Sequence, residues 1–578
     1  MSIKKSFLTV VAVCSLVLSN LGVTAVQAAT SASTTEQYGP WTVLQLAHDS
    51  AAGNIETVKV DRDLVVWTER DDYSGLRYLR MWDGASLRLL ATMNIVDWQG
   101  SDFYDSVEGN YDVADGVVVW TATDGRDSEI FAYRNGQSAR LTDNSYADKH
   151  PITSNGRIAW TQDMGTVYKL MVSDSAGVRS LDQYHVMNYA FSGNNLYWMN
   201  VTQPTGKFQV RCNTVDRTNY LSEAEVRALD YDYFVVDGEG SAAWEVLRQD
   251  IGDYGMNLVY LSVDGRTSSE AFRRQRWFYE PVLQDVHGGS ILISVHDVQT
   301  TRLQDDVSLL QTNGSWEATV ATSNVTYRAQ FSDDAHVRQT LPYSSSPLIV
   351  RHEDGFETKI SDERIRLNVF DAEDGVIIGG KNEGGGVLIY ADRLVTEVPT
   401  DADVRLVITN GDTAAWVSGT SGNSVLAVAM QAVLVGNSAD TSYVSGRLVK
   451  ADVSQSVYLA TPSGDRYVFP GEGQFYSWFS DFGSLQTVSA SELAAMPLKG
   501  SVLYPAHTLV KTPSSPEVYT VGTDGTLHWV MDGLVLSALY GNTWNRQVHD
   551  LPASFIAAYR VGAPVRDTVG YYTIAVVK

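Results

Sequence analysis

One pattern recurs along most of the chain: an apolar run that ends in tryptophan and is followed by polar residues. In its clearest copy, Asp115–Asp143, such a run ends at Trp120 and is followed by a polar patch, a second apolar run, an Asn-Gly turn and a third short run. The other copies end in Trp67, Trp160, Trp198, Trp244 and Trp416. A period of about 40 to 50 residues with three or four short strands predicts the blades of a β-propeller.

Burial explains why such units must form a ring. One twisted four-stranded sheet cannot bury both of its faces, whereas a ring of sheets can, each packing on its neighbours. Continuous apolar runs such as Val117–Trp120 are typical of strands covered on both faces. We therefore expect the tryptophans to pack between blades rather than to bind a ligand.

The units number eight or nine between Val58 and Gln431, and Thr326–Ser361 is the least regular of them. Because some units can be split or merged in such a count, we expect seven or eight blades. A lone strand at Gly39–Ala47 precedes the first full unit, and the last unit, Val407–Gln431, lacks a final strand. The N-terminal strand is therefore expected to complete the last blade, which removes two free sheet edges.

The repeated residues resemble a known group of propellers. The pattern Gly-x-x-hydrophobic-Trp-Thr, then Ser-Glu-Ile-Phe-x-Tyr, then Leu-Thr-Asp is similar to that of TolB-like propellers, and it covers roughly residues 40–435. This resemblance implies a propeller but no single activity, because the group includes binding scaffolds and accessory domains of enzymes.

A second repeat follows after about Ser438. Arg447–Pro470 and His507–Val530 share Leu-Val-Lys, Val-Tyr and a glycine-containing turn before an aromatic-rich strand, and a helix-like stretch follows each. In the first copy, Ser491 is expected to cap a short helix that Pro497 ends. The copies resemble a tandem module of secreted and surface proteins of small-genome candidate-phylum bacteria, a resemblance that implies no particular activity.

These patterns predict a mainly β chain: a seven- or eight-bladed β-propeller at 39–436, followed by a small α+β tandem repeat at 437–505 and 506–578. The first copy of this repeat is rich in aromatic residues. Flat rings that stack on sugar faces favour carbohydrate binding, while a small domain can also use aromatic rings as its core. The cluster consists of Tyr467, Phe469, Phe475, Tyr476, Trp478, Phe479 and Phe482.

The N-terminus has the features of a secretory signal peptide. Two lysines precede the apolar run Phe7–Leu18, and small residues at Val26–Ala28 form a cleavage site. We expect residues 1–28 to be removed and 29–38 to be a flexible leader; the alternative is a retained membrane anchor. The expected location is therefore secreted or at the cell surface, with no transmembrane segment in the mature chain.

The charge of the chain limits its partners. It has 43 Lys and Arg against 68 Asp and Glu, a formal net charge of -25. Such a surface repels nucleic acids and anionic membranes, so the expected partner is a protein or a glycan at the cell envelope. The mature chain keeps one cysteine, Cys212, and therefore has no intramolecular disulfide.

Motifs for catalysis are missing. No zincin motif, nucleophile elbow or P-loop occurs. Three histidines, His185, His287 and His336, fall near predicted blade-entry turns and could converge on the central pore. We expect no organic cofactor; calcium at acidic loops is the one metal hypothesis, with solvated turns as the alternative. These loops are Glu69–Gly75, Thr123–Glu129, Asp230–Gly240 and Ser332–His336.

One basic segment departs from the acidic background and is the candidate binding site. Arginine and aromatic residues alternate in it, a composition enriched in interface hot spots. Its members are Arg273, Arg274, Arg276, Trp277 and Tyr279. We expect an exported, non-enzymatic binding or scaffold protein that uses a propeller face. The alternative is a polysaccharide lyase or glycosidase with its site in the propeller pore, which requires converging carboxylates.

Overall fold

The structure is a computed structural model that describes residues 34–571 apart from connecting segments, of which 94–109 and 217–225 are the longest. Between residues 34 and 431 the described chain forms nine antiparallel sheets of four or five strands each. Eight of them are continuous in sequence: 53–93, 111–140, 147–182, 185–216, 226–275, 279–318, 326–359 and 367–398. The ninth combines 404–431 with 34–46.

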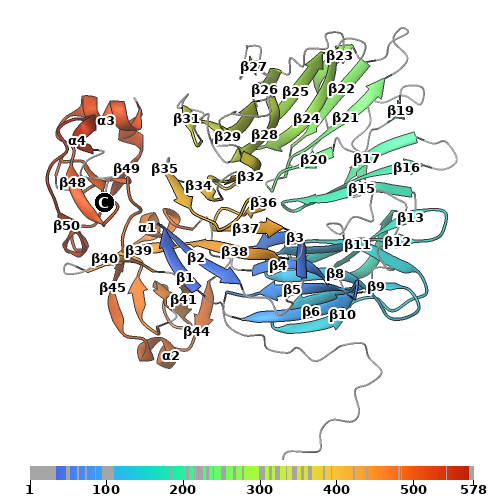
Figure 1. Cartoon of the computed structure of the whole chain (residues 1–578), viewed down its shortest axis with the longest axis horizontal. Coiled ribbons are helices and arrows are strands. Elements are labelled where there is room, and N and C mark those ends of the chain that lie inside the picture. The colour runs from blue at the N-terminus through green and yellow to red at the C-terminus, as the bar shows by residue number, and fades with distance from the viewer. Residues whose placement is uncertain are drawn as a thin grey trace, which may run out of the picture.

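These sheets form a closed ring. Each sheet has one innermost strand that contacts the innermost strand of the next sheet, and the innermost strand of the ninth sheet contacts that of the first. In every sheet but the fifth and the ninth, this strand is the first in sequence. These innermost strands are β3 (Gly53–Asp61), β7 (Tyr111–Ala114), β11 (Ala147–Ser154), β15 (His185–Ser192), β20 (Phe234–Val236), β24 (Tyr279–His287), β28 (Thr326–Ser332), β32 (Leu367–Glu373) and β36 (Val404–Thr409). Figure 1 shows several of them toward the middle of a fan, with the outer strands at its periphery.

The predicted fold class, a mainly β chain with a β-propeller, is confirmed. The ring has nine blades, however, where seven or eight were expected. The expected number was too low because the sequence repeat is irregular in 326–359. This segment nevertheless forms a complete four-stranded sheet of its own, without the marker tryptophan.

The chain's first strands close the ring. β2 (Trp41–Leu46) pairs with β38 (Asn423–Gln431), and β1 (Thr34–Tyr38) pairs with the outer edge of β2. The last blade therefore has the order β1-β2-β38-β37-β36, with β37 at Thr413–Thr420. The expectation that an N-terminal strand completes the last blade is confirmed by this pairing.

The marker tryptophans pack between blades, as predicted. All six lie in clusters with residues of the preceding blade, and Trp67 of the first blade packs against the ninth. Each is at most 2% exposed: Trp67, Trp120, Trp160, Trp198, Trp244 and Trp416. The repeat therefore marks the seams of the ring.

The C-terminal residues form two sheets with one strand order. The first has β44-β41-β42-β43-β45 and the second β49-β46-β47-β48-β50, and in each the two outer strands pair parallel with their neighbours. The first five are β41 (Arg447–Ala451), β42 (Val457–Ala460), β43 (Arg466–Val468), β44 (Gln486–Val488) and β45 (Leu498–Val502). The second five are β46 (Leu509–Lys511), β47 (Tyr519–Val521), β48 (Thr526–Trp529), β49 (Val548–Asp550) and β50 (Arg560–Val561). We call these units module 1 and module 2.

Four short helices complete the modules: α1 (Glu472–Tyr476) and α2 (Ala490–Ala495) in module 1, and α3 (Gly533–Tyr540) and α4 (Thr568–Tyr571) in module 2. The predicted cap of α2 is corrected by two positions. Ser489, not Ser491, is the N-cap, and its hydroxyl accepts a hydrogen bond from Glu492 N. Among the described residues, no helix is long and apolar enough to cross a membrane.

The modules follow the ring with almost no linker. β39 (Val433–Gly436) starts one residue after β38, and it pairs with β40 (Thr441–Val444) and with β45 of module 1. The intervening Ala432 is fully buried and its N–H donates to Pro40 O at 2.6 Å. Residues of both modules share one hydrophobic core. Figure 1 shows the modules beside the blade that contains β1 and β2.

Candidate functional site

The two faces of the ring differ in their connections. At one face, which we call the turn face, a tight turn joins the innermost strand of each blade to the second strand of the same blade, as between Ala114 and Val117. At the opposite face, the loop face, lie the loops between second and third strands and the links from blade to blade. The predicted site residues that the structure describes can be placed relative to these faces.

Hydrogen bonds tie neighbouring blades together at the turn face. Asp61 Oδ2 accepts from Gly116 N at 2.8 Å, so the first blade is tied to the second. Asp237 Oδ2 accepts in the same way from Gly288 N at 3.0 Å, between the fifth and sixth blades. These carboxylates hold turns in place, which gives the face a rigid rim.

Carboxylates from three blades act on one glutamate at this rim. Glu373 is the last residue of β32, and removal from water raises its pKa to about 8, with smaller contributions from nearby negative charges. Its side chain is nevertheless exposed. The raised pKa and the exposure are compatible if protein atoms surround the Glu373 carboxyl on most sides while part of the side chain still contacts water. The charges belong to Asp374, Asp371, Asp285 and Asp61; together with Glu373 we call these residues the acidic rim.

The acidic rim can act chemically in two ways. Carboxylates converging from several rigid strands attract a cationic or hydrogen-bond-donating ligand. A carboxyl whose pKa lies near neutrality can also donate a proton, as a general acid requires. Sequence reasoning missed these residues. Each sits close to a turn, but nothing in the sequence shows that residues 61, 285 and 373 meet.

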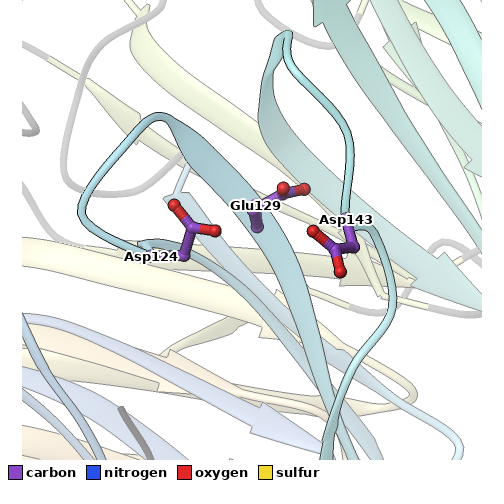
Figure 2. Close-up of side chains that lie close together, drawn as sticks. All are labelled: Asp124, Glu129 and Asp143. Atoms are coloured by element: carbon purple, nitrogen blue, oxygen red, sulfur yellow. The ribbon is translucent and has the colours of Figure 1, made fainter. Parts of the chain in front are cut away.

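A second carboxylate cluster lies at the loop face (Figure 2). Asp124, Glu129 and Asp143 have oxygens within 4.8 Å of one another, and the first two belong to the predicted acidic loop Thr123–Glu129. Glu129 is fully buried, and burial raises its pKa, opposed by hydrogen bonds from the Thr142 hydroxyl and from Asn144 N.

An arginine already balances part of this charge. Arg140 Nη1 lies 2.9 Å from Asp124 Oδ2, and the same guanidinium also pairs with Asp143. A guanidinium between two carboxylates supplies the positive charge that a bound cation would otherwise supply. The calcium hypothesis for this loop therefore stays a prediction, with Arg140 as the competing counter-ion.

The predicted arginine and aromatic segment links the outer edge of the fifth blade to the innermost strand of the sixth. Arg273 and Arg274 lie in β23 (Ser269–Gln275), where they pair with Leu258 and Asn257, and Tyr279 begins β24. Arg276 and Trp277 lie outside the described residues. Tyr279, at the start of β24, lies at the loop face, and the role of this segment in binding stays a prediction.

The three histidines do not converge. His185 begins β15 and His287 ends β24, so the two lie at opposite ends of innermost strands. His185 instead accepts a hydrogen bond from Tyr168 N at 3.3 Å. His336 lies in β29 (Ala335–Thr340), a second strand of its blade.

The aromatic cluster of module 1 divides into a core and a surface part. Phe469, Phe475 and Trp478 are at most 7% exposed and belong to the core shared by the modules, and Tyr467 and Phe479 pack against it. Tyr476 and Phe482, in contrast, are 53% and 42% exposed. The core interpretation therefore holds for the buried rings, and carbohydrate binding by the two exposed rings stays a prediction.

No protein-family model matches the chain, and no curated protein matches it in sequence. Among solved structures, the β-propeller domain of the Trilobed protease from Pyrococcus furiosus is 10% identical with a TM-score of 0.34, over 61% of this chain and 96% of that one. BamB from Moraxella catarrhalis is 11% identical with a TM-score of 0.29, over 70% and 98%.

An acylaminoacyl peptidase from Pyrococcus horikoshii is 11% identical with a TM-score of 0.31, over 63% of this chain and 57% of the peptidase. The chain thus spans less than two thirds of that enzyme. At such identities and TM-scores these similarities carry no inference about activity, and the fold assignment rests on the sheet topology.

Proposed function

We propose that this is an exported, non-enzymatic binding or scaffold protein of the cell surface, whose propeller holds a protein or glycan partner at the turn face. The observation that supports this most directly is the acidic rim, where Asp61, Asp285 and Glu373 come from three blades. The signal-peptide pattern at residues 1–28 supports export. The TolB-like repeat pattern is compatible with a binding role.

The acidic rim selects for partners of one charge type. A concentration of carboxylates raises the local concentration of cationic groups and speeds their association at low ionic strength. The partner groups expected there are lysine and arginine side chains of a protein, or the ammonium groups of an amino sugar. Strands position four of the five carboxylates, and a tight turn after β32 holds Asp374, which limits the reorganisation on binding.

The test compares the two faces. Biolayer interferometry would measure binding of a lysine-rich peptide and of chitosan to the mature chain, to Asp374→Asn/Glu373→Gln, and to the loop-face control Asp143→Asn. Asp374 and Asp143 are both exposed, so neither change creates a cavity. We expect the rim variant to weaken binding and the control to leave it unchanged. Equal binding by all three proteins would contradict a site at the rim.

A second function has one observation in its favour. With a pKa of about 8, Glu373 keeps its proton at neutral pH, as the general acid of a glycosidase does. If the chain were a polysaccharide hydrolase with its site in the pore, wild type would release reducing ends from a polysaccharide and Glu373→Gln would not. The binding proposal expects no release by either protein.

A further inference from the structure

The exposed part of the aromatic cluster in module 1 has an ordered geometry. Phe482 lies parallel to Phe475, with ring centroids 4.1 Å apart and an interplanar angle of 15°. Phe475 is 2% exposed, so it forms the floor on which Phe482 rests. One face of the Phe482 ring is therefore covered, and its 42% exposure leaves the other face open to solvent.

The Tyr476 ring packs at the edge of this stacked pair, at similar distances from both of its rings. Its ring makes an angle of 73° with Phe482 at a centroid distance of 5.7 Å, and of 87° with Phe475 at 5.3 Å. The exposed ring of Phe482 is thus flanked at its edge by a nearly perpendicular ring that carries a phenolic hydroxyl. A tyrosine in such a place offers apolar area and one hydrogen-bonding group together.

The second module shows that the fold does not need these rings. Leu448–Lys450 and Leu509–Lys511 both read Leu-Val-Lys and form the equivalent strands β41 and β46. The same offset aligns Val457-Tyr458 of β42 with Val518-Tyr519, where Tyr519 begins β47. Since the strand order of the two sheets is also the same, the offset can be carried into the helices that follow β43 and β48.

At that offset the buried position stays apolar and the exposed positions change. Phe475 corresponds to Leu536, and the two are 2% and 3% exposed. The exposed positions hold Ser537 in place of Tyr476 and Thr543 in place of Phe482. Packing therefore requires the floor but not the two exposed rings, and large exposed apolar groups that packing does not require indicate a binding surface.

We infer that Tyr476 and Phe482 form a stacking site for a pyranose ring of an uncharged glycan. A sugar ring has a flat face of C–H groups that fits the open face of Phe482, and an edge of hydroxyls that can meet the Tyr476 phenol. The net charge of -25 disfavours acidic glycans. This site lies in module 1 and is independent of the binding function proposed for the propeller.

Native gel electrophoresis of the mature chain would test this site. The gels contain no polysaccharide, a neutral glucan, mannan or xylan, or polygalacturonate as an acidic comparison. We expect retardation of wild type in at least one neutral gel and none with polygalacturonate. Unchanged mobility in every neutral gel would overturn the inference.

The double variant uses the residues that module 2 has at the equivalent positions, Ser537 and Thr543. Tyr476→Ser/Phe482→Thr should lose the retardation, while Phe482→Tyr, which keeps the ring, should retain it. Leu534→Ser removes an apolar group that is 77% exposed in module 2 and should behave as wild type. Retardation of the double variant equal to wild type would contradict the site.

Two further measurements distinguish loss of the glycan site from unfolding and from self-association. Thermal unfolding of the double variant should keep a single transition close to that of wild type, which shows that the module still folds. Sedimentation velocity would detect a dimer of wild type that the double variant lacks. That result would assign the two rings to self-association and overturn the glycan site.

Discussion

At the scale of residues, two of the seam tryptophans donate their indole N–H to buried carboxylates. The indole N–H of Trp160 donates to Asp148 Oδ1 at 3.0 Å, and that of Trp198 donates to Asp182 Oδ2 at 2.8 Å. The tryptophans were predictable because apolar runs precede them. The acceptors were not predictable from the sequence, because they follow no fixed rule. Asp148 lies in the same blade as Trp160, whereas Asp182 lies in the blade before that of Trp198.

Asp148→Ala should destabilise the protein by about 1–3 kcal/mol, because it leaves buried donors without their acceptor. Asp148 is fully buried and accepts from Trp160, from Gln162 Nε2 at 3.1 Å and from Asn144 Nδ2 at 2.6 Å. Urea unfolding would measure the change in free energy. Asp143→Ala, at a side chain that is 74% exposed, serves as the control and should shift it by less than about 0.5 kcal/mol.

Glu373 should make stability depend on pH. Its pKa is about 8 in the folded chain against an ordinary 4.5, so between these values the folded state binds more protons than the unfolded state. Its contribution is therefore fully present below about pH 4.5 and is lost as pH rises to 8. Glu373→Gln should remove this loss, which would appear as a higher melting temperature than wild type at pH 8 and a smaller difference at pH 5.

At the scale of elements, the innermost strands carry a repeated irregularity. In seven of the nine blades the pairing of the innermost strand with its neighbour shifts by an extra residue. Such bulges bend a strand and redirect a side chain. Period-2 patterns cannot predict them, since an inserted residue looks like ordinary sequence. In the ninth blade the extra residue is Arg405.

Arg405 ties the last blade to the first. Its Nη2 donates to Asn54 Oδ1 at 3.0 Å, to the Ile55 carbonyl and to Ser424 Oγ at 2.8 Å. Arg405→Ala should lower the free energy of unfolding by about 1 kcal/mol and speed proteolysis within residues 34–52. Arg179→Ala, which removes a half-exposed ion pair inside one blade, should leave that proteolysis unchanged.

The carboxylate cluster at the loop face allows a test of whether Arg140 stabilises it by balancing its negative charge. Arg140→Gln leaves Asp124, Asp143 and the buried Glu129 without their guanidinium, so like-charge repulsion should lower the melting temperature. Millimolar calcium should restore part of this loss in the variant. A fall in the melting temperature of wild type on adding EDTA would instead show that the cluster holds a cation beside Arg140.

At the scale of the whole molecule, local patterns predicted the propeller class and its closure, and they failed on the number of blades. Trp416 and the lone strand near Trp41 were sufficient to predict the last blade, which pairs β2 with β38. The blade at 326–359 lacks the marker tryptophan, as do those at 279–318 and 367–398, and its repeat is also the least regular of the nine. The acidic rim was missed because it exists only after ring closure brings distant blades together.

The pairing of β2 with β38 also has a consequence for the order in which the chain folds. The strand that locks the ring is synthesised first, and its partner only after eight further blades. Until then the growing chain is an open arc with two unsatisfied edges, and joining them costs the entropy of a very long loop. The final docking of the two ends should therefore be the slow phase of refolding, and a nascent chain that stops before residue 423 cannot reach the native state.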